Sequence, residues 1–211
     1  MELPSPAQLK QEIPLPSSAK EFIAASRAAA AQILEGKDER KALIAGPCSI
    51  HDEEAALEYA SRLKKLSFDV SHAFFPILRV FIEKSRTRTG WKGMLYDPYL
   101  DGSNDIAHGL AASRKLFVEL AERGVAAAAE LLEPLAVPYF DDVIVWGIVG
   151  ARTSASQPHR QMASALPFPV GFKNGIHGEL DAAISGILAS RAPHSYIGID
   201  PTGKISSLLS S

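Results

Sequence analysis

Short apolar segments alternate with amphipathic segments along the chain from residue 41 onward. The apolar segments have the length of buried β-strands, and they span residues 42–46, 76–82, 125–131, 147–151, 170–173 and 196–200. Between them, apolar side chains recur at helical spacing, which predicts helices at 53–67, 105–123, 136–145, 155–165 and 179–190. This alternation predicts an α/β fold with parallel strands joined by right-handed crossovers.

A (β/α) barrel explains the alternation better than a dinucleotide-binding fold. A doubly wound sheet has the same order of elements, but no glycine-rich phosphate-binding fingerprint follows the first strand. The strand-to-strand interval is about 32 residues, and a complete eight-stranded barrel takes about 250. We therefore predict a fold of the (β/α)8 TIM-barrel family of which the 211 residues hold only about the first five to six strands.

The N-terminal residues lack this alternation. Four of the first 17 residues are proline, which predicts an extended arm over residues 1–17. Ser18 and Glu21 then have the spacing of a capping box, and the apolar spacing that follows predicts a helix. We therefore divide the chain into an N-terminal arm and helix, residues 1–38, and a partial barrel domain, residues 39–211.

Composition and charge narrow the class of protein. The chain is 46% hydrophobic, which suits one buried core, and its formal net charge of -2 argues against a nucleic-acid partner. The first residues do not have the pattern of a secretory leader, and no apolar run approaches the roughly 18 residues of a membrane span. The single cysteine, Cys48, cannot form an internal disulfide. These features predict a soluble cytoplasmic protein with no membrane partner.

Functional side chains occur at the predicted carboxyl end of each of the first five strands. They are Cys48, Arg79 with Lys84, Glu130, Arg152 and Lys173. Parallel α/β folds bind their ligands at this end of the sheet. Because Arg79, Arg152 and Lys173 come from three different strands, we predict that they converge on a carboxylate or a phosphate. The alternative is that each forms a separate structural ion pair.

The segment from residue 76 to 93 predicts the rim of the same site. Arg79 lies within its apolar run, where a charge needs a partner. A loop rich in cations follows, and it contains Lys84, Arg86, Arg88 and Lys92. The alternative for this loop is a solvated basic surface that binds no ligand.

Cys48 has two interpretations. A lone cysteine is usually an inert core residue. Beside several cations at a strand end, however, its thiolate would be favoured, and the thiolate is the form that binds metals and attacks electrophiles. The six histidines show no metal-ligand spacing, and we predict no catalytic role for them.

Several ordered motifs resemble those of a known family. They are Gly46–Asp52 (GPCSIHD), Arg79–Lys84 (RVFIEK), Gly90–Gly93 (GWKG), Asp97–Pro98, Leu100–Ser103 (LDGS), Gly150–Thr153 (GART), Ser156–Gln157 with His159–Arg160, and Pro169–Gly175 (PVGFKNG). The chain is similar in these motifs to the class I 3-deoxy-D-arabino-heptulosonate 7-phosphate (DAHP) synthases. The resemblance implies a (β/α)8 barrel that needs a divalent metal and condenses phosphoenolpyruvate with erythrose 4-phosphate, the first step of the shikimate pathway of aromatic amino acid biosynthesis.

The resemblance also implies roles for individual residues. Cys48 corresponds to the family's metal-ligand cysteine, and Lys84 corresponds to a catalytic lysine between the two substrates. The residues that correspond to the phosphoenolpyruvate site are Arg79, Lys84, Glu130, Ala151, Arg152 and Lys173. Arg86 and Thr87 correspond to the loop that binds erythrose 4-phosphate. The resemblance further implies a homo-oligomer.

The chain departs from the family pattern in several places. Ser85 stands where the family usually has proline, and Arg88 stands where it usually has a second threonine. The family's other metal ligands, a histidine, a glutamate and an aspartate, have no counterpart in the sequence. Since a catalytic metal usually takes three protein ligands, we expect the isolated chain neither to bind a divalent metal tightly nor to turn over.

Three functions are consistent with these observations. The first is a DAHP synthase seen as a fragment or a truncated gene product. The second is a catalytically inactive truncated paralogue that acts as a regulatory or assembly partner of a full-length synthase. The third is an independent binder of sugar phosphates.

Overall fold

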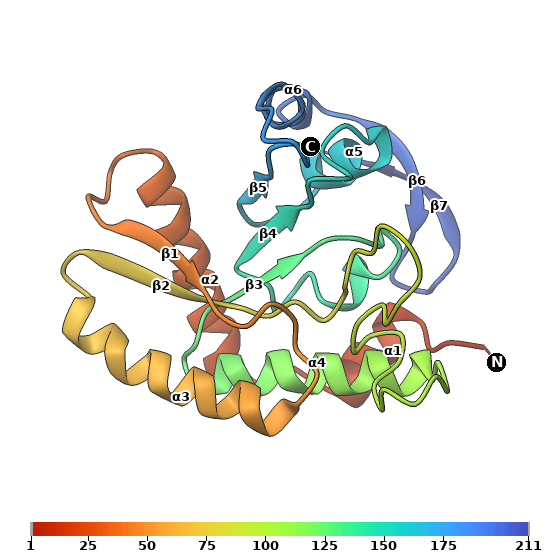
Figure 1. The fold of residues 1–211 in the computed structure, drawn as a ribbon, viewed down its shortest axis with the longest axis horizontal. Coiled ribbons are helices and arrows are strands. Elements are labelled where there is room, and N and C mark those ends of the chain that lie inside the picture. The colour runs from red at the N-terminus through yellow and green to blue at the C-terminus, as the bar shows by residue number, and fades with distance from the viewer. Residues whose placement is uncertain (1, 211) are drawn as a thin grey trace.

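The computed structural model describes residues 2–210. Five parallel strands form one sheet in the order β1-β2-β3-β4-β5 (Figure 1). Their bounds are β1 Lys41–Ala45, β2 Phe74–Arg79, β3 Ala127–Glu130, β4 Trp146–Val149 and β5 Val170–Phe172. Each strand pairs in parallel with the next along the chain, as in a (β/α) barrel, which confirms the predicted fold for these five strands.

Four of the predicted crossover helices lie close to their expected positions. They are α3 Glu53–Val70, α4 Ile106–Glu122, α5 Gln157–Ser164 and α6 Asp181–Ser190. Asp52 caps α3 by accepting a hydrogen bond from the Ala55 N–H at 2.9 Å, and Asp105 caps α4 by accepting one from the His108 N–H at 3.1 Å. None of the helices described between residues 2 and 210 is long and apolar enough to cross a membrane.

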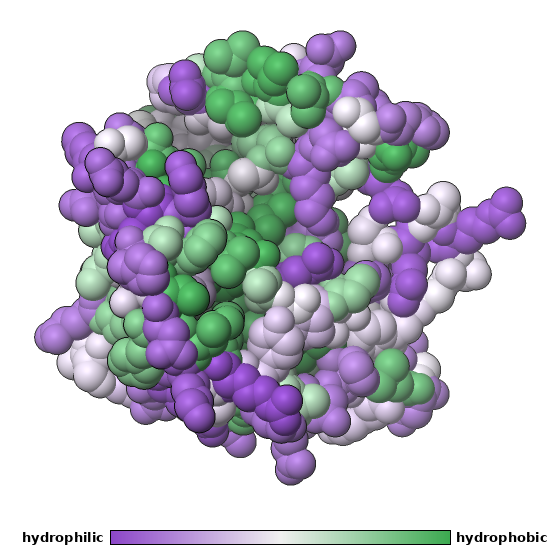
Figure 2. All heavy atoms as spheres, turned by 60° about the vertical axis from the view of Figure 1, so that its left-hand side comes forward, coloured by the Kyte–Doolittle hydropathy of each residue, from purple (hydrophilic) through white to green (hydrophobic). Residues whose placement is uncertain are grey.

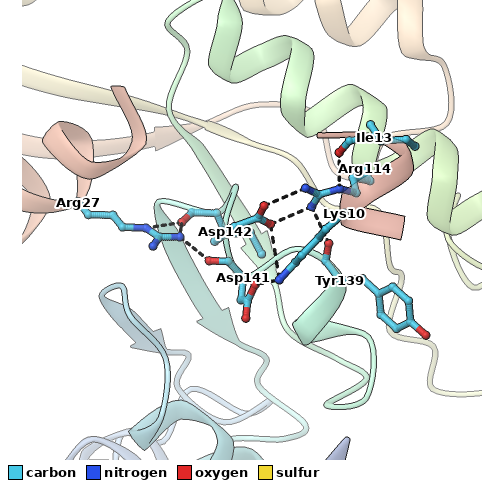
Figure 3. A network of polar contacts seen from close by, with 8 residues as sticks. Lys10, Ile13, Arg27, Arg114, Tyr139, Asp141 and Asp142 are labelled. Carbon is cyan, nitrogen blue, oxygen red and sulfur yellow. Dashed lines mark hydrogen bonds and ion pairs between the residues drawn. The ribbon is translucent and has the colours of Figure 1, made fainter. Parts of the chain in front are cut away.

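The prediction of a helix at 136–145 is wrong, because only the short 3₁₀ helix η1, Val137–Tyr139, forms there. Two arginine side chains donate hydrogen bonds to backbone carbonyls in this region (Figure 3). Arg114 donates to the Tyr139 carbonyl at 2.9 Å, and Arg27 donates to the Ile144 carbonyl at 2.9 Å. Since these carbonyls bond to side chains from distant elements, the segment folds as turns held by tertiary contacts instead of as a helix.

The extended arm predicted for residues 1–17 is also partly wrong, because it contains the helix α1, Pro6–Glu12. Pro6 occupies the first helical turn, where its missing N–H is not needed. Ser5 and Gln8 form a capping box, in which the Ser5 Oγ accepts from the Gln8 N–H at 3.2 Å and the Gln8 Oε1 accepts from the Ser5 N–H at 2.7 Å. Leu9 is only 1% exposed, so burial of its side chain fixes this helix on the protein.

The predicted second helix is present as α2, Ser17–Leu34, but it begins differently. Pro16 precedes it without a side-chain hydrogen bond to the helix, so the capping box predicted at Ser18 and Glu21 is wrong. Ile23 of α2 belongs to the same buried cluster as Leu78 of β2 and Phe117 of α4. The helix therefore contributes to the core of the sheet, and the division of the chain at residue 38 stays a prediction.

The sixth apolar segment is a strand, but it lies outside the parallel sheet. It forms β6, Ser195–Ile199, which pairs antiparallel with β7, Ile205–Leu209, in a separate hairpin. Asp200 makes the turn by accepting from the N–H groups of Thr202 at 2.9 Å and Lys204 at 3.1 Å. The partial barrel therefore holds five strands, the lower of the two numbers predicted.

Both outer strands of the sheet have a free edge. Within residues 2–210, β1 pairs with β2 alone and β5 pairs with β4 alone. Leu43 of β1 is partly exposed, as are Ile184 and Leu188 on one face of α6. Figure 2 views the molecule with the β1 side turned forward. In this view apolar side chains gather in a hollow near the middle of the surface. The sheet is thus an open partial barrel.

Candidate functional site

A cavity of about 150 Å³ lies at the carboxyl ends of strands β2 to β5. The residues that line it are Arg79, Lys84, Ser85, Glu130, Leu132, Gly150, Ala151, Arg152, Thr153 and Lys173. All six residues that the family resemblance assigns to a phosphoenolpyruvate site are among them. The structure brings these side chains together, while the role of each one stays a prediction.

Cys48 lies beside this cavity, on the segment that follows β1. Its sulfur is 2.6 Å from the Nζ of Lys84, which donates to it, and its carbonyl accepts a hydrogen bond from the Nη2 of Arg79 at 3.0 Å. The end of β1 can approach β2 this closely because Gly46 has no side chain: a Cβ there would lie 2.8 Å from the Arg79 carbonyl oxygen. The strand-end cysteine and lysine are therefore in direct contact.

The loop after β2 forms the rim of the cavity. Arg152 donates from Nη1 to the Ser85 hydroxyl at 3.2 Å and from Nη2 to the Thr87 hydroxyl. Arg86 instead donates to the Trp91 carbonyl of its own loop at 2.7 Å. The Thr87 hydroxyl therefore contacts a residue that lines the cavity, whereas the Arg86 guanidinium braces the loop.

The cations of this cavity outnumber its carboxylates. Lys173 pairs with Glu130 at 2.7 Å. In the part of the chain that the structure describes, no carboxylate lies within ion-pair distance of Arg79, Lys84 or Arg152. Three cations from the ends of two strands thus remain without an acidic partner, which favours a bound anion.

The ring of Phe81 contacts two cations of the cavity. The Arg79 guanidinium lies 4.0 Å from the centre of the Phe81 ring, and the Lys173 ammonium lies 5.1 Å from it. Phe81 is itself buried, so the ring is a fixed platform for both charges. The Nε of Arg79 is buried and has no hydrogen-bond partner in the residues described.

The buried hydroxyl of Ser154 holds the ends of β4 and β5 together. Its Oγ lies 3.0 Å from the Gly150 carbonyl and 2.7 Å from the Lys173 carbonyl. A Cβ at Gly150 would lie 2.9 Å from the Glu130 carboxylate, so a side chain here would push that carboxylate aside. These contacts set the spacing between Arg152, which follows β4, and the Lys173–Glu130 pair.

Lys84 changes the chemistry of Cys48. Its hydrogen bond to the sulfur and its positive charge lower the pKa of the exposed Cys48 thiol, and the charges of Arg79 and Arg86 add to the effect. A lower pKa gives more thiolate near neutral pH, which is the nucleophilic form. Cys48 is therefore not the inert core residue of the first interpretation.

Replacing Lys84 with methionine is expected to slow alkylation of Cys48 by iodoacetamide near neutral pH, by about tenfold for each unit by which the thiol pKa rises. The measurement is the rate of alkylation as a function of pH, followed by mass spectrometry. Lys92→Met is the matched control, since Lys92 lies on the same loop but does not contact the sulfur. Equal rates in the two variants would contradict the assignment.

The described residues do not fit a divalent metal site on their own. Between residues 2 and 210, no three histidine, cysteine or acidic side chains lie close enough together to hold an ion. The nearest polar group to the Cys48 sulfur is the ammonium of Lys84, which repels a metal ion instead of coordinating it. The role of Cys48 as a metal ligand therefore stays a prediction.

Two buried polar residues beside the cavity were missed by sequence reasoning. Glu83 is 5% exposed and His159 is 9% exposed, and both bond to the segment after β3. His159 belongs to one of the motifs that carry the family resemblance, and that was the only signal that could have drawn attention to it. The neighbouring Glu83 also lies within such a motif.

Comparison with known proteins agrees with this geometry. The DAHP synthetase I family matches residues 12–207. The Tyr-sensitive phospho-2-dehydro-3-deoxyheptonate aldolase of Escherichia coli (strain K12) is 46% identical over 98% of this chain, and the phospho-2-dehydro-3-deoxyheptonate aldolase of Corynebacterium glutamicum is 39% identical over 97% of it. The solved structure of a phospho-2-dehydro-3-deoxyheptonate aldolase from Francisella tularensis SCHU S4 superposes on the whole chain with a TM-score of 0.97, at 38% identity.

The chain is shorter than these relatives. It spans 58% of the Escherichia coli protein, 56% of the Corynebacterium glutamicum protein and 62% of the Francisella tularensis chain. The similarity nevertheless covers almost every residue that is present, and it includes the whole five-stranded sheet. The chain therefore belongs to the DAHP synthetase I family.

Proposed function

We propose that this chain supplies the phosphoenolpyruvate-binding part of a cytoplasmic DAHP synthase, the enzyme that condenses phosphoenolpyruvate with D-erythrose 4-phosphate to DAHP and phosphate. The observation that carries the proposal is the group of cations without acidic partners at the strand ends, Arg79, Lys84 and Arg152. Relatives named phospho-2-dehydro-3-deoxyheptonate aldolase support the same reaction. No feature of residues 2–210 favours the alternative of a non-catalytic partner.

The size and charge of the cavity suit this ligand. At about 150 Å³ the cavity is well below the roughly 300–1,000 Å³ of pockets for drug-sized ligands, so it suits a three-carbon anion better than a nucleotide. Phosphoenolpyruvate carries a carboxylate and a phosphate, which match the forked donors of Arg79 and Arg152. Lys84 and Lys173 add charge on either side.

The reaction joins two anions, so much of the catalytic task is to hold them together. In the proposed reaction the enol carbon of phosphoenolpyruvate bonds to the aldehyde carbon, whose oxygen takes up a proton. Water adds to the cationic carbon that forms and loses its protons, and phosphate leaves as the C–O bond to it breaks and the ketone forms. Arg79, Arg152 and Lys173 would offset the charge of the first substrate, while Lys84 and Thr87 would face the second. In this proposal, residues of the chain itself bind and orient the two substrates.

Phosphoenolpyruvate binding tests the proposal directly. Isothermal titration calorimetry of the wild-type chain is expected to show saturable binding. Arg152→Ala is expected to weaken it about tenfold to a hundredfold, since a hydrogen bond to a charged group contributes about 1.5–3 kcal/mol.

Arg62→Ala is the matched control, because Arg62 is an exposed arginine of α3 far from the strand ends and its loss should leave the affinity unchanged. Absence of binding by the wild-type chain, or an equal loss in the two variants, would refute the proposal.

A further inference from the structure

A buried glutamate side chain holds the segment that follows β3. Glu83 lies four residues after the end of β2, and its side chain accepts hydrogen bonds from the backbone N–H groups of Leu132 and Glu133, each at 3.2 Å. Glu83 is 5% exposed, so both bonds are shielded from water. One side of the Leu132–Glu133 segment is therefore fixed to the end of β2.

A buried histidine holds the other side of the same segment. The Nε2 of His159 lies 3.0 Å from the carbonyl oxygen of Leu132, and its Nδ1 lies 2.8 Å from the Ser156 hydroxyl. A carbonyl only accepts, so Nε2 carries a proton and donates it, and in the neutral ring Nδ1 accepts from the hydroxyl. Leu132 is thus held through its N–H by Glu83 and through its carbonyl by His159.

This clamp joins two segments that line the cavity, those after β2 and β3, to helix α5. Glu83 directly precedes Lys84, whose own N–H donates to the Lys92 carbonyl at 2.7 Å. Leu132 lines the cavity and lies two residues after Glu130, the partner of Lys173. Any movement of the clamped segment would therefore change the spacing between the Lys84 ammonium and the Glu130 carboxylate.

Stability alone does not account for the choice of glutamate at position 83. A buried carboxylate is unfavourable without a cation, and no cation lies within ion-pair distance of Glu83 in the chain between residues 2 and 210. Its charged neighbours are instead the carboxylates of Glu130 and Glu133, with the Tyr96 phenol beside them. A carboxyl group whose two oxygens accept from two successive N–H groups gives a geometry that an apolar side chain cannot.

We propose that Glu83 and His159 are positioning residues that clamp the Leu132 peptide from its two sides and so set the spacing of Lys84 and the Glu130–Lys173 pair for the anionic substrate. This inference rests on the proposed function, because it concerns the same cavity. Neither side chain touches the substrate in this proposal. Each acts through the backbone that it holds.

Hydrogen exchange and ligand titration together test the clamp. Glu83→Leu is expected to speed exchange of the Leu132 and Glu133 amides at least tenfold in NMR spectra and to weaken phosphoenolpyruvate binding about tenfold. Glu83→Gln keeps one acceptor oxygen and is expected to restore part of both properties. His159→Phe should weaken binding to a similar extent, and His159→Gln, which keeps a donor for the Leu132 carbonyl, should restore part of it.

Ser113→Ala is the matched control, because Ser113 is a fully buried polar residue of α4 whose hydroxyl has no partner among the residues described. It should change neither property. Unchanged exchange in Glu83→Leu would overturn the clamp, and faster exchange with unchanged affinity would overturn the positioning role. Failure of the proposed function shows in the wild-type chain, which then does not bind, whereas failure of this inference shows only in the variants.

Discussion

Replacing Arg114 with methionine is expected to lower the free energy of unfolding by about 3–5 kcal/mol. The guanidinium is completely buried and donates to both carboxylate oxygens of Asp142 at 2.8 Å, as well as to the carbonyls of Ile13 and Tyr139 at 2.9 Å (Figure 3). The variant would leave the Asp142 carboxylate without these bonds and release the N-terminal segment from α4. Urea denaturation followed by circular dichroism gives the change.

Arg62→Met is the control for this prediction. Arg62 is 80% exposed and pairs with Glu58 one helical turn away, so its loss should cost no more than about 1 kcal/mol. The two variants remove the same charge and differ in burial. A loss of less than about 1 kcal/mol for Arg114→Met would mean that the network in Figure 3 does not hold the N-terminal segment in place.

The second large effect is a fall in stability between about pH 5 and pH 8 that depends on Glu83. Burial, together with the charges of Glu133 and Glu130, raises the pKa of Glu83 from its ordinary value of 4.5 to about 8. The folded chain therefore keeps a proton on this group that the unfolded chain releases, so stability present at low pH is lost as the pH rises toward 8. Linkage gives a loss of about 3–4 kcal/mol over this interval.

Glu83→Gln isolates this effect, because glutamine has the shape of the protonated side chain and does not titrate. Urea denaturation at several pH values is expected to show that the wild-type chain loses stability relative to the variant as the pH rises. Parallel curves for the two chains would show that Glu83 is ionised throughout this interval.

The strands could be predicted because burial decides their conformation. The alanines at 126–129 favour a helix by propensity, yet three of them form most of β3, and the Ala126 carbonyl already accepts from the Leu78 N–H at 2.7 Å. A helix needs more residues than this short run offers. Tertiary pairing on both sides of the run therefore outweighs a few tenths of a kcal/mol per residue of helix propensity.

The errors share a different cause, because each depends on a turn or on a distant partner. The prolines of the N-terminal segment predict an extended arm, yet α1 forms because Pro6 is tolerated in the first turn of a helix. The residues Asp200-Pro201-Thr202-Gly203 form the turn of the hairpin, and this signal was present in the sequence. No local signal in the sequence could exclude the helix expected at 136–145. One of the contacts that replaces it is the hydrogen bond from Arg27 to the Ile144 carbonyl, and these two residues are 117 positions apart.

The residues of the candidate site fall into the same two groups, those that the sequence could locate and those that depend on a distant partner. Arg79, Arg152 and Lys173 could be placed together because their position at strand ends is visible in the sequence. Glu83 could not be assigned a role, because its partners are backbone N–H groups that begin 49 residues further along the chain. Backbone groups have no signature in the sequence, so a side chain that acts through them is found only in the folded structure.

The shared direction of the strands has a consequence for the two free edges of the sheet. Every strand runs toward the rim at which Arg79 and Lys173 lie. A further strand that pairs in parallel with β1 or β5 must end at this same rim, so the loop that follows it begins at the rim. The polarity of the sheet therefore fixes where new chemical groups arrive: a strand added at either edge brings its carboxyl end, and the loop after it, to the rim of the site.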